Sequence, residues 1–239
     1  PAPKNQDKEV SRLQYISAGT LATPELLIEQ AFNEIIHFAQ ISKNGAVYAQ
    51  NAINEADTDK FEELRKKLVK YEEISDRIEY EIATFLNGVS AEEISENTSI
   101  KIKAMYKIIG ELESLGDSGE AISRILSRKN IHNKRFNKEA LKNLNLMAGA
   151  VSAAYDVMIE NLTSAHKGEL VDIANAYSAE DHLNALRNNL RDAVIEDIEN
   201  DGNNYQTSVY YMDIVNEYEH MGDFMINVSQ DLERAFGRK

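Results

Sequence analysis

Two similar segments in the sequence limit the folds that the chain can adopt. Residues 108–126 read IIGELESLGDSGEAISRIL, and residues 214–232 read IVNEYEHMGDFMINVSQDL. They align without a gap at an offset of 106 residues, with identical residues at Ile108/Ile214, Glu111/Glu217, Glu113/Glu219, Gly116/Gly222, Asp117/Asp223, Ser123/Ser229 and Leu126/Leu232. Self-similarity at a fixed spacing is typical of a duplicated structural unit. We therefore expect two copies of one unit.

Both halves of the chain show long segments of 3.6-residue periodicity and no convincing strand pattern. Only 3 prolines and 11 glycines occur in 239 residues, which suits long helices. Thr23-Pro24-Glu25 is a helix start signal, and Ser90-Ala-Glu-Glu93 reads as a capping box that opens the third helix. Six helices are expected, at about 23–53, 57–88, 90–127, 137–163, 168–199 and 204–236.

These helices form two groups of three. We expect a lead-in over residues 1–22, a first three-helix repeat over 23–128, a linker over 129–136 and a second three-helix repeat over 137–239. The basic stretch RKNIHNKR at 128–135 is polar enough to join two units. The predicted fold is all-α, a tandem repeat of two three-helix bundles with six long antiparallel helices. Because the chain begins PAPKNQDKEV without methionine, we expect a mature form or part of a longer protein.

Composition excludes several classes of function. The net charge is -14, from 40 acidic and 26 basic residues, so a nucleic-acid partner is not expected. There is no cysteine, which excludes disulfides, thiolate zinc sites and cysteine nucleophiles. No apolar run reaches the roughly 20 residues of a membrane-spanning helix, so the chain as given should be soluble. Without a nucleophile motif or a glycine-rich phosphate loop, we expect no enzyme but a binding or regulatory protein.

Pairs of carboxylates recur on the second and third helices of each unit. Ile102, Met105, Ile109, Glu113 and Asp117 follow one another at spacings of three or four, which predicts that both acids continue a buried apolar face. Burying charge is costly unless the charge is paired or coordinated. The remaining members of the pattern are Glu72 and Asp76, Glu219 and Asp223, and Glu180 with Asn184 in place of an aspartate.

This spacing predicts metal ligands. Carboxylates at positions i and i+4 lie on the same side of a helix and can bind one cation. Oxygen ligands alone favour hard cations such as iron, magnesium, manganese or calcium. The predicted ligands are Glu72, Asp76, Glu113, Asp117, Glu180, Glu219 and Asp223; Asn184 leaves the second-half cluster one charge short.

Two other interpretations stay open. Glu34-Ile-Ile-His37 and Glu217-Tyr-Glu-His220 have the Glu-x-x-His spacing of ferritin-like di-iron carboxylate proteins, although the two motifs do not occupy equivalent positions in the repeat. The acidic side chains could also be a solvated face of a metal-free helical adaptor. Iron loading would separate the first of these, since a histidine-ligated site reacts with oxygen.

The paired segments at 108–126 and 214–232, together with YEEISDRIEYEI and EDHLNALRNNLRDAV, resemble the PhoU family of phosphate-transport regulators. The resemblance covers about residues 23–236 and implies tandem three-helix bundles, control of phosphate transport or signalling, and carboxylate-bound metal clusters in some members.

The lead-in LQYISAGTLATPELLIEQAFNEI is similar to the start of the PhoU-like domain of bacterial sodium/phosphate cotransporter-related proteins. It implies a membrane phosphate transporter domain as partner, in cis or in trans, at the cytoplasmic face of the inner membrane. A homodimer is a further expectation.

Overall fold

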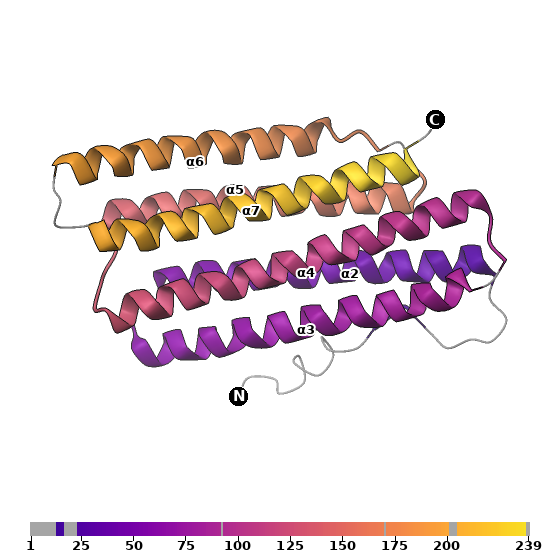
Figure 1. Cartoon of the computed structure of the whole chain (residues 1–239), viewed down its shortest axis with the longest axis horizontal. Coiled ribbons are helices and arrows are strands. Elements are labelled where there is room, and N and C mark those ends of the chain that lie inside the picture. Colours follow the sequence, from indigo (N-terminus) through magenta and orange to yellow (C-terminus); the bar gives the residue numbers. More distant parts are fainter. Residues whose placement is uncertain (1–12, 17–22, 92, 170, 201–204, 238–239) are drawn as a thin grey trace.

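The computed structural model describes residues 13–16, 23–91, 93–169, 171–200 and 205–237, without the side chains of 195–200. This part of the chain forms helices and no strand, which confirms the all-α prediction (Figure 1). The six helices are α2 (Pro24–Asn54), α3 (Thr58–Ser90), α4 (Glu96–Ile131), α5 (Lys138–His166), α6 (Ala174–Asn200) and α7 (Tyr205–Phe236). The expected lead-in over 1–22, apart from 13–16, and the expected helix start at residue 204 lie outside the described residues.

The helices form two three-helix bundles that lie side by side. Helices α2, α3 and α4 pack on one another, and α5, α6 and α7 do the same. The two bundles join through α4 against α7 and α2 against α5, while α3 and α6 lie on opposite outer sides (Figure 1). The predicted tandem architecture is therefore confirmed.

The packing of the helices repeats the pattern of the sequence. A Cβ on Gly116 would lie 2.5 Å from Ser75 Oγ, and a Cβ on Gly222 would lie 2.9 Å from Leu183 Cδ1. Both glycines thus allow the third helix of a bundle to approach the second closely. Ser75 and Leu183 are 108 residues apart, the offset that also relates Glu72 to Glu180. The duplication is therefore visible in helix contacts as well as in residue identities.

A side-chain cap marks the start of α4, and the cap predicted for this helix is wrong. Ser90 is the last residue of α3 and its hydroxyl donates to the carbonyl of Leu86, so it does not open the third helix. The N-cap of α4 is Ser95, whose hydroxyl accepts from the Thr98 amide at 3.1 Å. A serine hydroxyl can satisfy either helix end, and the capping-box pattern does not distinguish between the two.

Helices α4 and α5 end in the same way. Asn133 (φ 54°) and Gly168 (φ 72°) adopt left-handed conformations just beyond the last turns. In each case the amide of the next residue returns to a carbonyl five residues back, as Lys134 does to Lys129 at 3.0 Å. This pairing satisfies carbonyls that the helix end leaves free. As a result α4 continues to Ile131, into the predicted linker, and Gly168 closes α5 instead of opening α6.

None of the helices in the described part of the chain is both long enough and apolar enough to cross a bilayer.

Candidate metal centre

The close approach of α3 and α4 brings acidic residues of the two helices together. Gly116 lies against Ser75, and each is followed directly by an aspartate, Asp117 and Asp76. Without a Cβ between the helices, these neighbours reach the same groove. Glu72 precedes Asp76 by one turn and faces the same side. The sequence thus positions the site through a glycine–serine contact next to the charged residues.

Three of the predicted ligands form a compact group. Carboxylate oxygens of Glu72, Asp76 and Asp117 all lie within 4.8 Å of one another. In the described residues this is the one group of at least three acidic or histidine side chains with such a spacing. Two oxygens on one ion are at most about 5 Å apart for Ca²⁺ and about 4 Å apart for Mg²⁺. The bound of 4.8 Å falls within the span of Ca²⁺, and a smaller hard cation would draw the carboxylates closer together.

The predicted burial of this face is wrong. Asp76 and Asp117 are exposed, and Glu72 and Glu113 are half-buried, whereas Ile102, Met105 and Ile109 belong to the core. Each step of four residues advances about 40° beyond a full turn. The run 105, 109, 113, 117 therefore rotates by about 120° from the core into the α3–α4 groove. The groove is accessible to solvent, so an ion can reach the carboxylates without opening the bundle.

Like charges and burial raise the pKa of several of these acids. Burial is the largest cause for Glu72, and Asp76 and Asp117 add to it. Burial also raises the pKa of Glu113, followed by Asp117 and Asp76, with the Ser114 hydrogen bond opposing. For Asp117, burial and Asp76 raise the pKa while Arg124 lowers it. Each shift disfavours the charged form, and a bound cation would reverse the effect.

Two further acids at this site are not among the predicted ligands. Glu79 adds to the rise in the pKa of Glu113, and Glu120 adds to that of Glu72. Glu120 also pairs with Arg124 at 2.8 Å. Both acids follow a predicted ligand, Glu72 or Glu113, by seven residues, which returns to the same side of a helix after two turns. That spacing was the signal that could have found them.

The equivalent groove of the second repeat contains a different set of charges. Arg187 occupies the position of Glu79 at the same offset of 108, and its guanidinium pairs with Glu219 at 3.3 Å. The Asn184 amide donates to Glu180 Oε1 at 3.1 Å. Asp223 is half-buried and belongs to no group of three acids in the described residues. A protein cation therefore neutralises part of this groove.

The two Glu-x-x-His motifs do not meet in the structure. Glu34 is fully buried on α2, where Oε2 accepts from the backbone amides of Gln14 (2.8 Å) and Tyr15 (2.9 Å). Its Oε1 lies 3.1 Å from His37 Nδ1. On α7, His220 is exposed and lies 4.0 Å from Glu219. The Glu34 carboxylate is therefore committed to the lead-in segment, and the described residues offer no histidine-containing group of three ligands.

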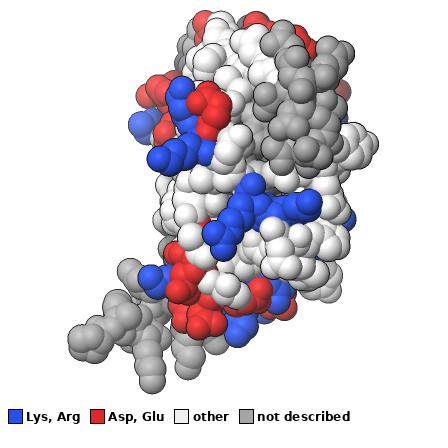
Figure 2. Space-filling model, turned by 90° about the vertical axis from the view of Figure 1, so that its left-hand side faces the viewer, with Lys and Arg blue, Asp and Glu red and all other residues white. Residues whose placement is uncertain are grey.

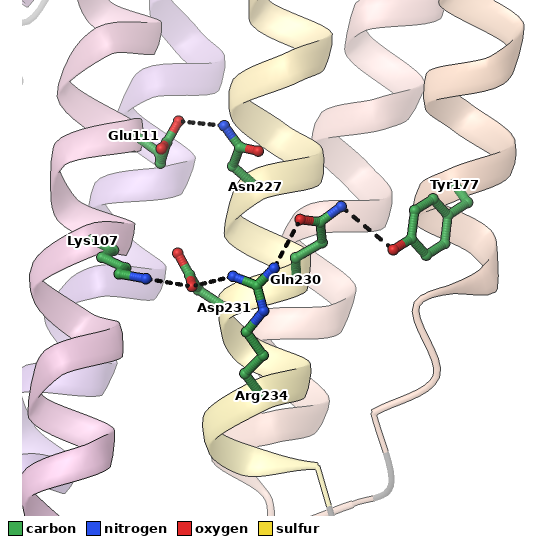
Figure 3. A network of polar contacts seen from close by, with 7 residues as sticks. All are labelled: Lys107, Glu111, Tyr177, Asn227, Gln230, Asp231 and Arg234. Carbon is green, nitrogen blue, oxygen red and sulfur yellow. Dashed lines mark hydrogen bonds and ion pairs between the residues drawn. The ribbon is translucent and has the colours of Figure 1, made fainter.

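Other acids hold the two bundles together. Figure 3 shows a polar network across α4, α6 and α7, made of Lys107, Glu111, Tyr177, Asn227, Gln230, Asp231 and Arg234. Asn227 donates to Glu111 at 3.2 Å, and Lys107 pairs with Asp231 at 3.4 Å. Burial raises the pKa of Glu111, the Asn227 hydrogen bond lowers it, and Asp231 raises it. These acids contribute to helix packing and lie outside the candidate centre.

Comparison with solved structures identifies the architecture. PhoU from Pseudomonas aeruginosa superposes with a TM-score of 0.76 at 12% sequence identity, over 88% of this chain and 97% of that one. The phosphate transport system regulatory protein PhoU from Streptococcus pneumoniae gives 0.73 at 14% identity, over 89% and 96%. The chain has the PhoU fold. No family model and no curated protein matches the sequence.

The resemblance to PhoU inferred from the carboxylate segments is thus confirmed for the fold. At 12% and 14% identity, the likeness extends to helix order and packing. Because function is determined by individual residues at a site, the PhoU-like groove has to be judged by its own side chains. In this chain the first repeat presents a group of free carboxylates, and the second presents an ion pair.

Proposed function

We propose that this chain is a PhoU-like regulatory domain, without catalytic activity, that controls phosphate transport or phosphate signalling. The observation that carries the proposal is the match to PhoU structures along nearly the whole of both chains. The regulatory target is a membrane phosphate transporter domain, of the sodium/phosphate cotransporter-related kind, contacted in cis or in trans at the cytoplasmic face of the inner membrane. Homodimerisation remains a prediction.

The proposed metal site lies in the first repeat. Glu72, Asp76 and Asp117 would hold a hard cation such as iron, manganese or magnesium, with Glu113 beside them. The cation would supply positive charge to a groove whose carboxylates repel one another, and so would fix α3 against α4. In the second repeat, Glu180, Glu219 and Asp223 would bind metal more weakly because Arg187 already supplies a cation.

The position of the proposed metal site beside α3 leads to a specific regulatory proposal. In the described part of the chain, α3 packs against α2 and α4 alone, so its outer side is open to a partner. A metal ion in the α3–α4 groove therefore lies where a partner can contact both the ion and the helices. We assign the transporter contact to this side of the first repeat.

A transport measurement in the source organism tests the proposal. Cells that lack the chain should show altered uptake of radiolabelled phosphate, and the wild-type chain should restore normal uptake. The Asp76→Asn/Asp117→Asn variant should fail to restore it at equal abundance. A Glu160→Gln/Asp181→Asn control, which removes two exposed acids of the second repeat, should succeed. Unchanged uptake in cells that lack the chain would refute the regulatory role.

A further inference from the structure

A cavity of about 380 Å³ lies at the end of the molecule where α4 passes into α5. Its walls come from the α2–α3 turn, the last turn of α4 and the α4–α5 link. The apolar part of the wall includes Ile53, Phe61 and Phe136. Pockets that bind small molecules commonly measure about 300–1,000 Å³ and combine apolar walls with a few polar groups. The cavity is large enough for more than a single inorganic ion.

Three cations line this cavity without a counter-ion among the residues that the structure describes. Lys129, Lys134 and Arg135 belong to its wall, and none of them forms an ion pair with a described residue. Other basic residues of the chain do pair, including Arg65 with Glu62 at 2.9 Å. In a protein of net charge -14, three unpaired cations around one cavity need an explanation.

The acids in the same wall are already engaged. Asp57 caps α3, where its carboxylate accepts from the amides of Asp59 and Lys60 at 3.0 Å. Glu55 Oε1 accepts from the Asp57 amide at 2.9 Å. These hydrogen bonds hold both carboxylates on the α2–α3 turn, and among the described residues neither acid forms an ion pair with Lys129, Lys134 or Arg135. The cations therefore remain available to a ligand.

The turn after α4 gathers the cations. The left-handed Asn133 reverses the chain, so that the Lys134 amide bonds back to the carbonyl of Lys129. Lys129 Nζ lies over the Phe136 ring at 4.8 Å, and burial together with Arg135 lowers the pKa of this lysine. Figure 2, which looks onto this end, shows lysine and arginine side chains in a band across the middle of the face.

Helix polarity alone does not account for this arrangement. Basic residues in a last turn interact favourably with the helix dipole, an effect confined to that turn. That applies to Lys129, which lies inside α4. Lys134 and Arg135 lie beyond the end of the helix and still line the cavity.

We propose that this cavity binds a small organic phosphate, with the phosphate group on Lys129, Lys134 and Arg135 and the organic part against the apolar wall. The inference does not depend on the proposed metal site. Asp117 and Lys129 lie on the same helix, 12 residues and so about 18 Å apart.

Calorimetric titration of the purified chain in a phosphate-free buffer tests the proposal. The probes are AMP, inorganic phosphate, and adenosine, which lacks the phosphate. AMP should bind saturably, inorganic phosphate should compete with it, and adenosine should not bind. The Lys134→Gln/Arg135→Gln variant should bind AMP at least about tenfold more weakly, since charged hydrogen bonds to phosphate are lost. The Lys66→Gln/Lys103→Gln control changes net charge equally on exposed surfaces and should bind normally.

Several results would overturn the proposal. One is the absence of AMP binding to the wild type at about 10 mM, well above the range of a specific small-molecule site. Another is equal weakening in the control variant, which would indicate a general field effect. A third is capture by phosphatidylglycerol vesicles without AMP binding, which would assign the cations to a lipid surface. Melting curves of both variants that match the wild type ensure that lost binding reflects the cavity.

Discussion

Replacing Asp76 and Asp117 with asparagine should stabilise the metal-free protein, because it removes the repulsion among the three carboxylates of the site. The carboxylate oxygens of Glu72, Asp76 and Asp117 lie at most 4.8 Å apart. At that distance two unit charges repel each other by about 0.9 kcal/mol in bulk water. Physiological salt lowers the repulsion energy of each pair of carboxylates to roughly 0.5 kcal/mol. The double substitution removes all three repulsive pairs. Because the side chains are largely exposed, we expect the free energy of unfolding to rise by about 1 kcal/mol. For a chain of this size that raises Tm by about 2–4 °C.

The pH dependence gives this prediction a second test. The raised pKa values of Glu72, Glu113 and Asp117 mean that the folded protein holds their protons more tightly than the unfolded chain. Their contribution to stability therefore falls as the pH rises from the ordinary pKa values, 3.8 for Asp and 4.5 for Glu, through the raised pKa values of the folded protein. The variant should be the more stable protein at pH 7, and the difference should close toward pH 4.

The assay is urea unfolding in EDTA and again with added Mn²⁺. In EDTA the Asp76→Asn/Asp117→Asn variant should have a higher free energy of unfolding than the wild type. The Glu160→Gln/Asp181→Asn control should have the same free energy of unfolding as the wild type. With free metal at a hundred times its Kd, the wild type should gain about 2.7 kcal/mol and the variant far less, so that the order reverses. A variant that is less stable than the wild type in EDTA by 1 kcal/mol or more would refute the reasoning, because the acids would then be structural.

Three further predictions concern the repeat and its turns. Asn184→Asp/Arg187→Glu gives the groove of the second repeat the same charges as the groove of the first and should raise the amount of metal bound per chain. Unchanged metal content by elemental analysis would contradict the explanation that these two residues weaken metal binding in the second repeat. Gly116→Ala places a Cβ 2.5 Å from Ser75 Oγ and should cost about 1–3 kcal/mol in urea unfolding. Adding Ser75→Gly should recover much of that loss, and no recovery would contradict the steric explanation. Gly168→Ala meets no atom within 4 Å but has φ 72°, so it should cost about 1 kcal/mol, and an unchanged Tm would contradict the role of the backbone conformation.

Much of the architecture could be predicted because a helical bundle repeats a simple pattern. The 106-residue offset pairs Gly116 with Gly222, and both glycines allow the same kind of close helix contact. Helix ends were harder, since Ser90 and Ser95 carry the same chemistry and the choice between them depends on which backbone groups are free. Gly168 is predicted to begin the fifth helix, but its left-handed conformation ends α5.

The candidate site was predictable in position and only partly in character. The spacing of Glu72, Asp76 and Asp117 placed them on facing helices, where the structure brings them together. The 3.6-residue periodicity could not show that Asp117 is exposed, because small angular steps add up along a long helix. Contacts between residues far apart in the sequence could not be predicted either. An example is Glu34, whose carboxylate accepts hydrogen bonds from two backbone amides of the lead-in segment.

Metal content tests the central claim most directly. Protein purified without chelator would be analysed for iron, manganese and magnesium, next to Asp76→Asn/Asp117→Asn and Glu180→Gln/Asp223→Asn variants. The account predicts that the wild type carries metal, that the first variant loses most of it, and that the second variant keeps most of it. A wild type that stays empty after metal loading, or equal losses in both variants, would contradict a metal centre in the first repeat.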